Sequence, residues 1–383
     1  EMCIRDRTAS EVAGVNDTTS LAMIFLQFAF GASAGFCTVT SCFVGARDSA
    51  GVRRSMATQI VLSAALTAVL TALALALLDP MLAWINVTPA SGEVYRAAYT
   101  YCAIIFAGIG AQLFYNFICS FLRSMGDSVT PLAFLLFSTV LNVGLDLLFI
   151  IAFRWGVAGA AIATVSAQLI STLGCFAYAF SKYPELRLHQ EDWQITRHDV
   201  TRHLIQGIPL GLQFSVLAIG IIVVQSIVVQ FDMLNGVMVS NSAQNGFGAA
   251  NKINSLLMTP LNGLGSAMTS FTAQNLGAAK YDRIRAGFRA GLKLVWALCV
   301  PIVLLYVFAS RPLVHIFLDS PEGLAMDTGV MFLRIIAPFY FIVSAKLVSD
   351  GILRGAGLMK KFMIATFTDP VSYTHLTLPT TSR

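Results

Sequence analysis

Long blocks of apolar residues, separated by short polar segments, dominate the chain of 383 residues. Each block is close to the ~20 apolar residues that an α-helix needs to cross a bilayer. The blocks lie near residues 20–45, 56–78, 95–122, 131–153, 156–180, 204–231, 243–275, 288–310 and 328–353, and a further one begins near 360. Because a backbone in lipid must satisfy its own hydrogen bonds, this pattern predicts an all-α polytopic membrane protein.

Short motifs repeat at long range along the chain. The Gly-Ala pair at 45–46 returns at 277–278, and the Leu-Arg-x-x-Gly motif at 122–126 returns at 353–357. Asp79-Pro80-Met81 likewise corresponds to Arg311-Pro312-Leu313. The offset from 45 to 277 equals the offset from 79 to 311, and we call it the repeat offset; the Leu-Arg-x-x-Gly motif returns one position short of it. This agreement predicts two copies of one helical unit, an architecture typical of secondary transporters.

Charged residues make up 12% of the chain, about half the ~25% of an ordinary soluble domain. The basic residues gather in alternate segments between the apolar blocks, and the net charge is +5. By the positive-inside rule these segments, which include Arg53, Lys182 and Arg283, are cytoplasmic, and no nucleic-acid partner is expected. Both Gly-Ala motifs fall in basic segments with six predicted helices between them. The two copies should therefore be parallel repeats with the same orientation.

A polar segment at 181–203 separates the two copies and is expected to be a cytoplasmic linker. It would join an N-lobe at 8–180 to a C-lobe at 204–370. Its histidines, His189, His198 and His203, could form a zinc site, but we expect them to be solvated. Residues 1–7 and 371–383 resemble translated adapter sequence and are interpreted as non-native. The seven cysteines show no paired motif spacing, and no metal site is expected.

Three segments of the second copy carry a family resemblance. They are Gly207-Ile208-Pro209-Leu210-Gly211-Leu212-Gln213, Gln274-Asn275-Leu276-Gly277-Ala278 and Ser349-Asp350-Gly351-Ile352-Leu353-Arg354-Gly355-Ala356-Gly357. With the repeat, they resemble the multidrug and toxic compound extrusion (MATE) transporters, in the DinF-like bacterial branch, from about residue 10 to Asp369. The resemblance implies two six-helix lobes. This chain is expected to supply helices two to ten and the start of eleven, and so to be truncated at both ends.

The same resemblance implies the function. A MATE protein is a secondary antiporter of the bacterial cytoplasmic (inner) membrane, which exports organic, often cationic, compounds in exchange for H+ or Na+ by alternating access of two lobes. The implied partners are a small organic substrate, a lipophilic cation in particular, and the lipid bilayer. We expect a monomer that uses no cofactor besides the coupling ion and has no catalytic residues.

A carboxylate within an apolar helix is the main candidate for ion coupling. Asn142 and Asp146 are spaced i, i+4 and share one helix face. Thr164, on the next predicted helix, lies at nearly the same depth as Asp146. A charged Asp within a bilayer costs at least ~2.5 kcal/mol, so it must face protein or water. The three residues resemble the family's cation-coupling cluster, although a buried polar pair that only locks helix packing is the alternative.

Further candidates lie in the second copy. Lys346 and Asp350, also spaced i, i+4, are expected to form an ion pair with a structural or gating role. Pro209 and Pro260 interrupt helical hydrogen bonds and are hinge candidates. Glycine pairs at 31 and 35 and at 207 and 211 permit close helix contact. The candidates for lining a cleft between the lobes share amide side chains: Gln213, Gln244, Asn245, Asn251 and Asn254.

Three other functions were weighed. A flippase for lipid-linked precursors or oligosaccharides would want a large basic cavity, yet the cations within the predicted spans are few: Lys252, Arg334 and Lys346. A membrane-embedded enzyme would need a convergent acid–base or metal set, and no histidine lies inside a predicted span. A channel would need a filter-like repeat of carbonyl loops, which is not visible.

Overall fold

The computed structural model describes the chain except for residues 1–8, 85–86, 235–236, 239–241, 319–322 and 367–383, so both terminal segments interpreted as non-native lie outside the described residues. The chain begins with α1 (Ala9–Ala46), α2 (Ser49–Ala76), α3 (Leu78–Trp84), η2 (Pro89–Ser91), α4 (Glu93–Ala107), α5 (Ile109–Ser124), α6 (Val129–Asp146), the π-helix η3 (Leu147–Ala152) and α7 (Gly156–Lys182). The short helices η4 (Pro184–Leu186) and η5 (Gln190–Trp193) lead to α8 (Arg197–Gln230).

The remaining elements follow a two-stranded hairpin of β1 (Met233–Leu234) and β2 (Val237–Met238). They are α9 (Ser242–Gly277), α10 (Tyr281–Phe308), α11 (Ser310–His315), α12 (Leu324–Ile336), η6 (Ala337–Phe339) and α13 (Tyr340–Gly355). Residues 359–366 are also helical. Each apolar block of the sequence coincides with a helix or a pair of helices, so the predicted order of helices is confirmed. For the block near 243–275 a membrane span stays a prediction, because α9 is not among the described helices that are long and apolar enough to cross a membrane.

Length and apolar composition show that this is a multi-pass membrane fold. Among the described residues, 7 helices are long and apolar enough to cross a membrane, or up to 8 if the bent pair α4–α5 counts as one span. The outer face of α6 illustrates the point, because its exposed residues are apolar at helical spacing: Leu132, Leu136, Val140, Val143 and Leu147. An apolar stripe of this length is stable against lipid rather than water.

One predicted span is bent. The sequence block near 95–122 forms α4 and α5, which meet at 44° around Gly108. A methyl group on Gly110, just beyond the break, would lie 2.9 Å from the Thr67 side chain of α2. Glycine at this break therefore lets a neighbouring helix approach closely while the backbone changes direction.

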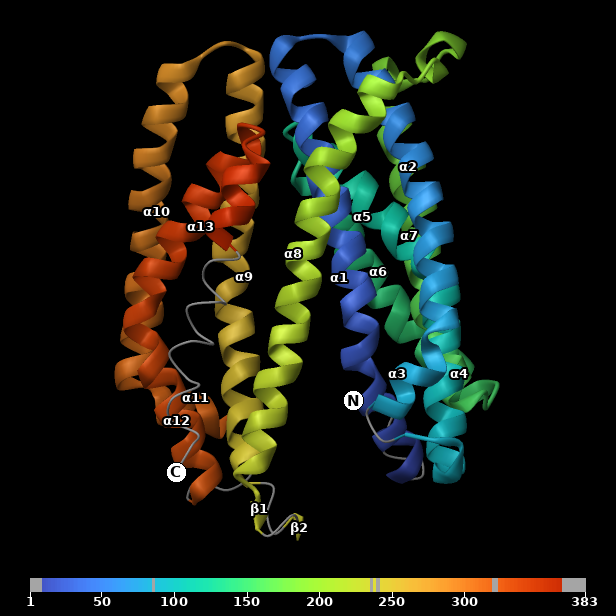
Figure 1. Ribbon diagram of the computed structural model, residues 1–383, viewed down its shortest axis with the longest axis vertical. Helices are drawn as coiled ribbons and strands as arrows, with labels where there is room; N and C mark the ends of the chain where they lie inside the picture. Colours follow the sequence, from blue (N-terminus) through green and yellow to red (C-terminus); the bar gives the residue numbers. More distant parts are fainter. Residues whose placement is uncertain (1–8, 85–86, 235–236, 239–241, 319–322, 367–383) are drawn as a thin grey trace. The chain divides into compact units, whose positions relative to one another are not determined.

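Contacts divide the chain into two units, Glu1–Ala218 and Ile219–Arg383. In the first unit α1 packs against α2, α4 and α5, and in the second unit α9 packs against α10, α12 and α13 (Figure 1). The division falls inside α8, beyond the expected start of the C-lobe at 204. The first part of α8 therefore packs with the first unit, while the lobe boundaries themselves stay a prediction.

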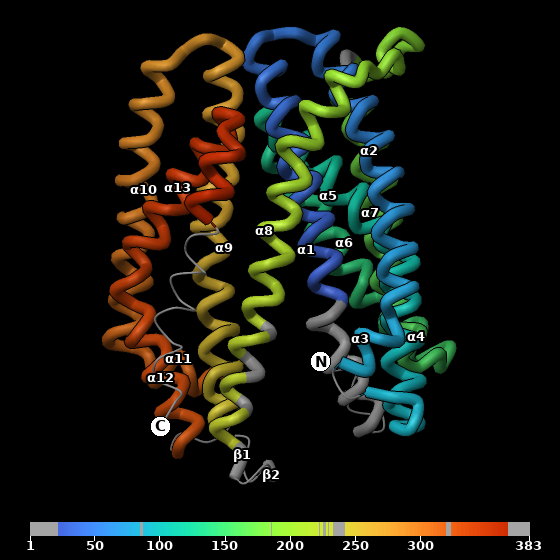
Figure 2. Tube along the Cα trace, viewed as in Figure 1, coloured from blue at the N-terminus to red at the C-terminus, as the bar shows by residue number. Residues whose placement is uncertain are grey.

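The two repeats share their turns residue for residue. Arg47 after α1 and Ala279 after α9 both take positive φ, 57° and 54°. In the turn after α1, the amide at 47 donates to the carbonyl at 44 and the amide at 48 donates to the carbonyl at 43. In the turn after α9, the amide at 279 donates to the carbonyl at 276 and the amide at 280 donates to the carbonyl at 275. Each turn joins two antiparallel helices (Figure 2). This is a Schellman-type helix end, and it recurs at the repeat offset that the sequence shows.

The second shared turn follows the Leu-Arg-x-x-Gly motif. Gly126 and Gly357 take φ of 95° and 73°. The amides at 127 and 358 donate to the Leu122 and Leu353 carbonyls at 3.0 and 2.9 Å. Glycine is the residue that adopts this backbone conformation without strain. The motif therefore recurs because both helices stop in the same way.

The two predicted glycine pairs meet each other in the first unit. A methyl group on Gly31 of α1 would lie 2.6 Å from the Leu210 carbonyl oxygen of α8, and one on Gly35 would lie 2.5 Å from that of Gln206. Any larger side chain at these positions would push the helices apart. The close helix contact predicted from the spacing is thus confirmed, between α1 and the first part of α8.

A buried carboxylate ties the start of α6 to the end of α7. Asp127 accepts hydrogen bonds from the Thr130 amide at 3.0 Å, the Lys182 ammonium at 2.7 Å and the Tyr183 hydroxyl at 3.0 Å. Burial alone would raise the pKa of Asp127, but these hydrogen bonds outweigh it and hold that pKa well below its usual range. The interaction fixes α6 against α7 at one end, and the candidate site lies further along the same pair.

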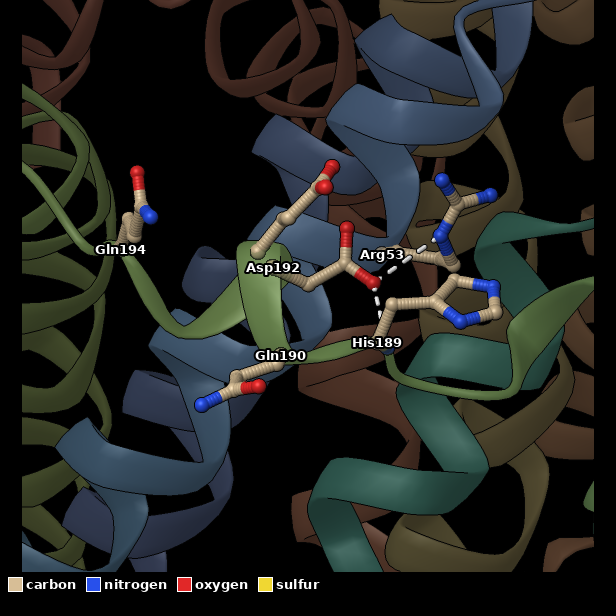
Figure 3. A pocket seen from close by; sticks show the side chains of 6 residues that line it. Arg53, His189, Gln190, Asp192 and Gln194 are labelled. Atoms are coloured by element: carbon tan, nitrogen blue, oxygen red, sulfur yellow. Dashed lines mark hydrogen bonds and ion pairs between the residues drawn. The ribbon is translucent and has the colours of Figure 1, made fainter.

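The linker is clasped to α2 by three consecutive residues. Arg53 pairs with Asp192 at 3.0 Å (Figure 3), Arg54 pairs with Asp199 at 3.6 Å, and Ser55 hydrogen-bonds to His203 at 2.8 Å. We call these three contacts the linker clasp.

The clasp corrects one expectation about the histidines. His189 and His198 are exposed as predicted, but His203 is only 1% exposed. Its ring packs against Phe36, and its Nδ1 hydrogen-bonds to the Asp199 carbonyl. The expectation of a solvated His203 was wrong because the residue lies inside α8, on the face that packs against the first unit.

Candidate functional site

The structure joins two of the three candidate coupling residues, Asn142 of α6 and Thr164 of α7. Asn142 donates from Nδ2 to the Thr164 hydroxyl at 3.5 Å, and that hydroxyl donates to the Ala160 carbonyl at 3.0 Å. Asp146 lies one turn beyond Asn142 on the same helix. All three side chains are half-buried. The i, i+4 spacing thus places an amide and a carboxylate on the face of α6 that meets α7.

The backbone changes its geometry directly after Asp146. Regular α6 ends at that residue, and Leu147–Ala152 continues as a π-helix. The Phe153 amide accordingly donates to the carbonyl five residues back, Leu148, at 3.0 Å. Single π-turns within helices are costly and occur often at functional sites. The apolar run Leu-Leu-Phe-Ile-Ile-Ala gives no sign of this, so the sequence analysis missed it.

A tyrosine from a third helix lies within reach of the field of the carboxylate. Tyr101 of α4 lies within electrostatic range of Asp146. Its helix also packs against α7, which carries Thr164. A phenol next to a carboxylate offers a hydroxyl that can donate a hydrogen bond to the charged form. No signal in the sequence points to Tyr101, because only the folding of α4 against α7 relates it to Asp146.

This arrangement suits a small cation. Carboxylate, amide and hydroxyl oxygens are hard ligands of the kind that bind ions such as Na+, and a carboxylate can instead take up a proton. In a half-buried membrane setting, either ion would remove the cost of an uncompensated carboxylate charge. The described residues hold no group of three or more His, Cys, Asp or Glu side chains that could bind a transition metal.

The second unit holds its candidate pair as an ion pair. Lys346 of α13 donates to Asp350 at 2.8 Å, with the lysine side chain 35% and the aspartate side chain 8% exposed. The Arg354 guanidinium, one turn further, donates to the Asp350 main-chain carbonyl at 3.3 Å. The pair exists as the spacing predicts, and its structural or gating role stays a prediction.

One amide of α9 joins a buried hydrogen-bond chain. Asn254 accepts from the Tyr340 hydroxyl at 2.6 Å, and Tyr340 hydrogen-bonds to the Tyr306 hydroxyl at 3.0 Å. Both tyrosines are buried, and the two hydroxyls come from α13 and α10. These hydrogen bonds therefore link three helices of the second unit. Sequence analysis could not pair Asn254 with these tyrosines, because they lie on helices far away along the chain.

The other amide candidates are less enclosed. Gln244 and Asn251 are half-buried and Asn245 is exposed, whereas Gln213 is buried on α8 with no hydrogen-bond partner for its Oε1 among the described residues. The two carboxylate oxygens of Asp232 accept hydrogen bonds from the main-chain amides of Ala243 and Gln244 and so cap the start of α9. The cleft-lining role of these amides stays a prediction.

The two hinge candidates lie inside unbroken helices. Pro209 falls within α8 and Pro260 within α9, and both helices continue past them. Proline removes one helical hydrogen bond and so weakens the helix locally. The hinge role stays a prediction.

The fold and the site define a class: a multi-pass helical membrane protein built from two repeats, with a carboxylate held between helices of the first. The MatE family model matches residues 2–148 and 218–372. The chain belongs to the MatE family of transporters, and the resemblance drawn from its motifs is confirmed. Its position within the DinF-like branch stays a prediction.

Curated relatives carry transporter names. The probable multidrug resistance protein YpnP of Bacillus subtilis (strain 168) is 30% identical over 91% of this chain and 75% of its own length. The probable multidrug resistance protein YoeA of the same organism is 24% identical, over 94% of this chain and 78% of its own.

A solved structure shows the same fold. The outward-facing conformation of a multidrug resistance MATE family transporter of the MOP superfamily superposes with a TM-score of 0.83 at 22% identity, covering 95% of this chain and 79% of that one. These similarities are to transporters, and the expectation that the protein is not an enzyme is confirmed.

Proposed function

We propose that this protein is a secondary antiporter of the bacterial cytoplasmic membrane that exports small organic compounds, lipophilic cations in particular, in exchange for H+ or Na+. Family membership and the multidrug-resistance names of its relatives support export of organic compounds. The basic segments between helices support the orientation. Because those relatives carry multidrug-resistance names, the flippase alternative is not favoured.

One observation carries the coupling part of the proposal: Asp146 sits half-buried at the end of α6, one turn beyond Asn142, whose side-chain amide donates to the Thr164 hydroxyl of α7. A coupling ion must bind one conformation of the transporter better than another. When Asp146 is charged, its face of α6 needs water or a cation. When a proton or Na+ neutralises it, the same face can close against its neighbours. Ion binding at Asp146 therefore shifts the conformational equilibrium that drives alternating access.

The test is dye transport by the purified transporter in proteoliposomes under an imposed proton or sodium gradient. Asp146→Asn removes the charge and keeps the shape, so gradient-driven transport should be lost while dye binding is retained. Asn142→Ala and Thr164→Ala should weaken coupling more mildly, because each supplies one neutral ligand. Asp79→Asn, which neutralises an exposed carboxylate on α3, is the matched control and should transport normally.

Wild-type transport by Asp146→Asn under both gradients would mean that Asn142, Asp146 and Thr164 only pack α6 against α7. Loss of transport by the Asp79 control as well would show that the assay reports folding rather than coupling.

A further inference from the structure

The start of α10 carries three basic residues on one face. Arg285, Arg289 and Lys293 follow each other at intervals of four residues, and all three side chains are exposed. This spacing places them one above the other along about 12 Å of helix. Among the described residues, no acidic side chain forms an ion pair with any of them. Asp282 precedes them in the first turn, where the helix dipole stabilises a carboxylate.

The same face continues as an apolar stripe. Trp296, Val300 and Leu304 follow Lys293 at intervals of three or four residues, and they are 43%, 47% and 50% exposed. α10 is one of the helices apolar enough to span a membrane. A helix face that is basic in its first turns and apolar beyond them matches the boundary between lipid headgroups and acyl chains. Trp296, at the change, is the residue type that concentrates at that boundary.

The repeat shows that the three basic residues of α10 are not needed for the fold. At the repeat offset, Arg53, Ala57 and Val61 of α2 correspond to Arg285, Arg289 and Lys293. The first unit thus keeps one of the three charges, and Asp192 of the linker neutralises it. α2 and α10 otherwise share their place in the repeat, directly after the shared turn. The additional cations of α10 are therefore not required by the shared fold, and their exposed side chains are available to a partner.

We propose that Arg285, Arg289 and Lys293 form a binding site for anionic phospholipid headgroups on the cytoplasmic leaflet. Each guanidinium or ammonium can reach a phosphate while its aliphatic stem lies along the apolar face. Lys293 sits deepest and contacts the phosphate of a lipid whose acyl chains lie against Trp296 and Val300. Attraction of a basic residue to an anionic surface is on the order of a fivefold gain in binding per charge at moderate salt.

The experiment uses Trp296 as the reporter. The other three tryptophans, Trp84, Trp155 and Trp193, are all exposed and are replaced by phenylalanine. The single-tryptophan protein is reconstituted with phosphatidylcholine or phosphatidylglycerol that carries brominated acyl chains, which quench a tryptophan on contact. Brominated phosphatidylglycerol should quench Trp296 several-fold more effectively at low mole fraction, and high salt should reduce this preference.

Two charge variants separate the site from general cytoplasmic charge. Arg285→Gln/Arg289→Gln/Lys293→Gln should bring the ratio of Trp296 quenching by brominated phosphatidylglycerol to quenching by brominated phosphatidylcholine close to one. Arg197→Gln/Lys360→Gln/Lys361→Gln removes the same number of exposed cations elsewhere and should leave it unchanged. Lipid retained by the protein with all four tryptophans, counted by mass spectrometry, checks that the phenylalanine replacements did not create the result.

Equal quenching by both lipids would overturn the proposal, and so would a preference that survives loss of the three basic residues. Loss of the preference for phosphatidylglycerol on adding millimolar inorganic phosphate would also overturn the proposal, because Arg285, Arg289 and Lys293 would then form a site for soluble anions.

Discussion

The helices α5 and α13 end the corresponding parts of the two repeats and differ in one instructive way. Both stop at Leu-Arg-x-x-Gly with the same backbone turn. When the two motifs are aligned, however, Tyr115 and Cys119 of α5 stand where Lys346 and Asp350 of α13 form their ion pair. The same fold is therefore compatible with a neutral pair and with a charged pair at these positions.

This difference teaches where each repeat keeps its charge. In the first unit the half-buried carboxylate is Asp146, on α6, beside the amide of Asn142 and the hydroxyl of Thr164. In the second unit Asp350 is a buried carboxylate within α13, and a lysine of its own helix neutralises it. A carboxylate that already has its cation on the same helix is poorly suited to exchange ions. We therefore propose that coupling occurs in the first unit and that the ion pair of the second unit has a structural or gating role.

The largest effect is expected from breaking the ion pair of α13. Lys346→Met leaves Asp350 buried beside only the neighbouring Arg354. Because the lysine is one-third exposed, the loss should be about 2–3 kcal/mol of unfolding free energy rather than the full cost of a buried charge. Thermal unfolding in detergent measures it.

A second variant sharpens this comparison. Lys346→Met/Asp350→Leu makes the site neutral, as Tyr115 and Cys119 make it in the first unit, and most of the stability should return. If the double variant is as unstable as the single one, the charged pair is required by the second unit and the comparison between the repeats fails.

A smaller effect is expected at Asp127, which anchors α6. Asp127→Asn should cost about 1–2 kcal/mol near neutral pH, since Lys182 is 40% exposed and partly screened. The pKa of Asp127 is lowered by folding, so its contribution is complete above the unfolded carboxyl pKa of ~3.9 and is lost as the pH falls below it. The difference in thermal stability between the variant and the wild type should therefore begin to narrow below pH ~4, and it should vanish only below the lowered pKa of the folded state.

A constant difference between the two proteins from pH 7 to pH 3 would contradict this account of Asp127. It would mean that the asparagine disturbs packing rather than the hydrogen bonds to Thr130, Lys182 and Tyr183.

The smallest effect is expected at the linker clasp, which the second unit lacks: at the repeat offset, Gly287 replaces Ser55. Ser55→Ala leaves the Nε2 atom of buried His203 without this partner, also removes the hydrogen bonds of the Ser55 hydroxyl to Thr40 and Gln59, and should cost about 1 kcal/mol. Thr201→Ala, which removes an exposed hydroxyl of α8, is the control and should cost less than that. Equal losses would show that the Ser55–His203 hydrogen bond contributes nothing specific.

Much of this fold follows from local pattern. Apolar block length predicts the spans, and the repeated Gly-Ala and Leu-Arg-x-x-Gly motifs predict matched helix ends because glycine and its neighbours specify turns over a few residues. Asn142, Asp146 and Thr164 could be placed together because helical spacing and depth are simple geometry.

The remainder depends on pairings distant in sequence. The bend at Gly108 and the π-helix after Asp146 have no signal in the local apolar pattern, and Tyr101 is related to Asp146 only through the folding of α4 against α7. Burial of His203 likewise depends on Ser55, which lies 148 residues away. No window of sequence contains both partners of such contacts.

The most direct test of the comparison is equilibrium binding of the coupling ion to the purified transporter. Radioactive sodium binding, and proton release on adding substrate, would be measured for the wild type, Asp146→Asn and Lys346→Met/Asp350→Leu. The account predicts saturable binding of at least one of these ions by the wild type and by the double variant, and none by Asp146→Asn. Unchanged ion binding by Asp146→Asn, together with its loss in the double variant, would contradict it and would place coupling in the second unit.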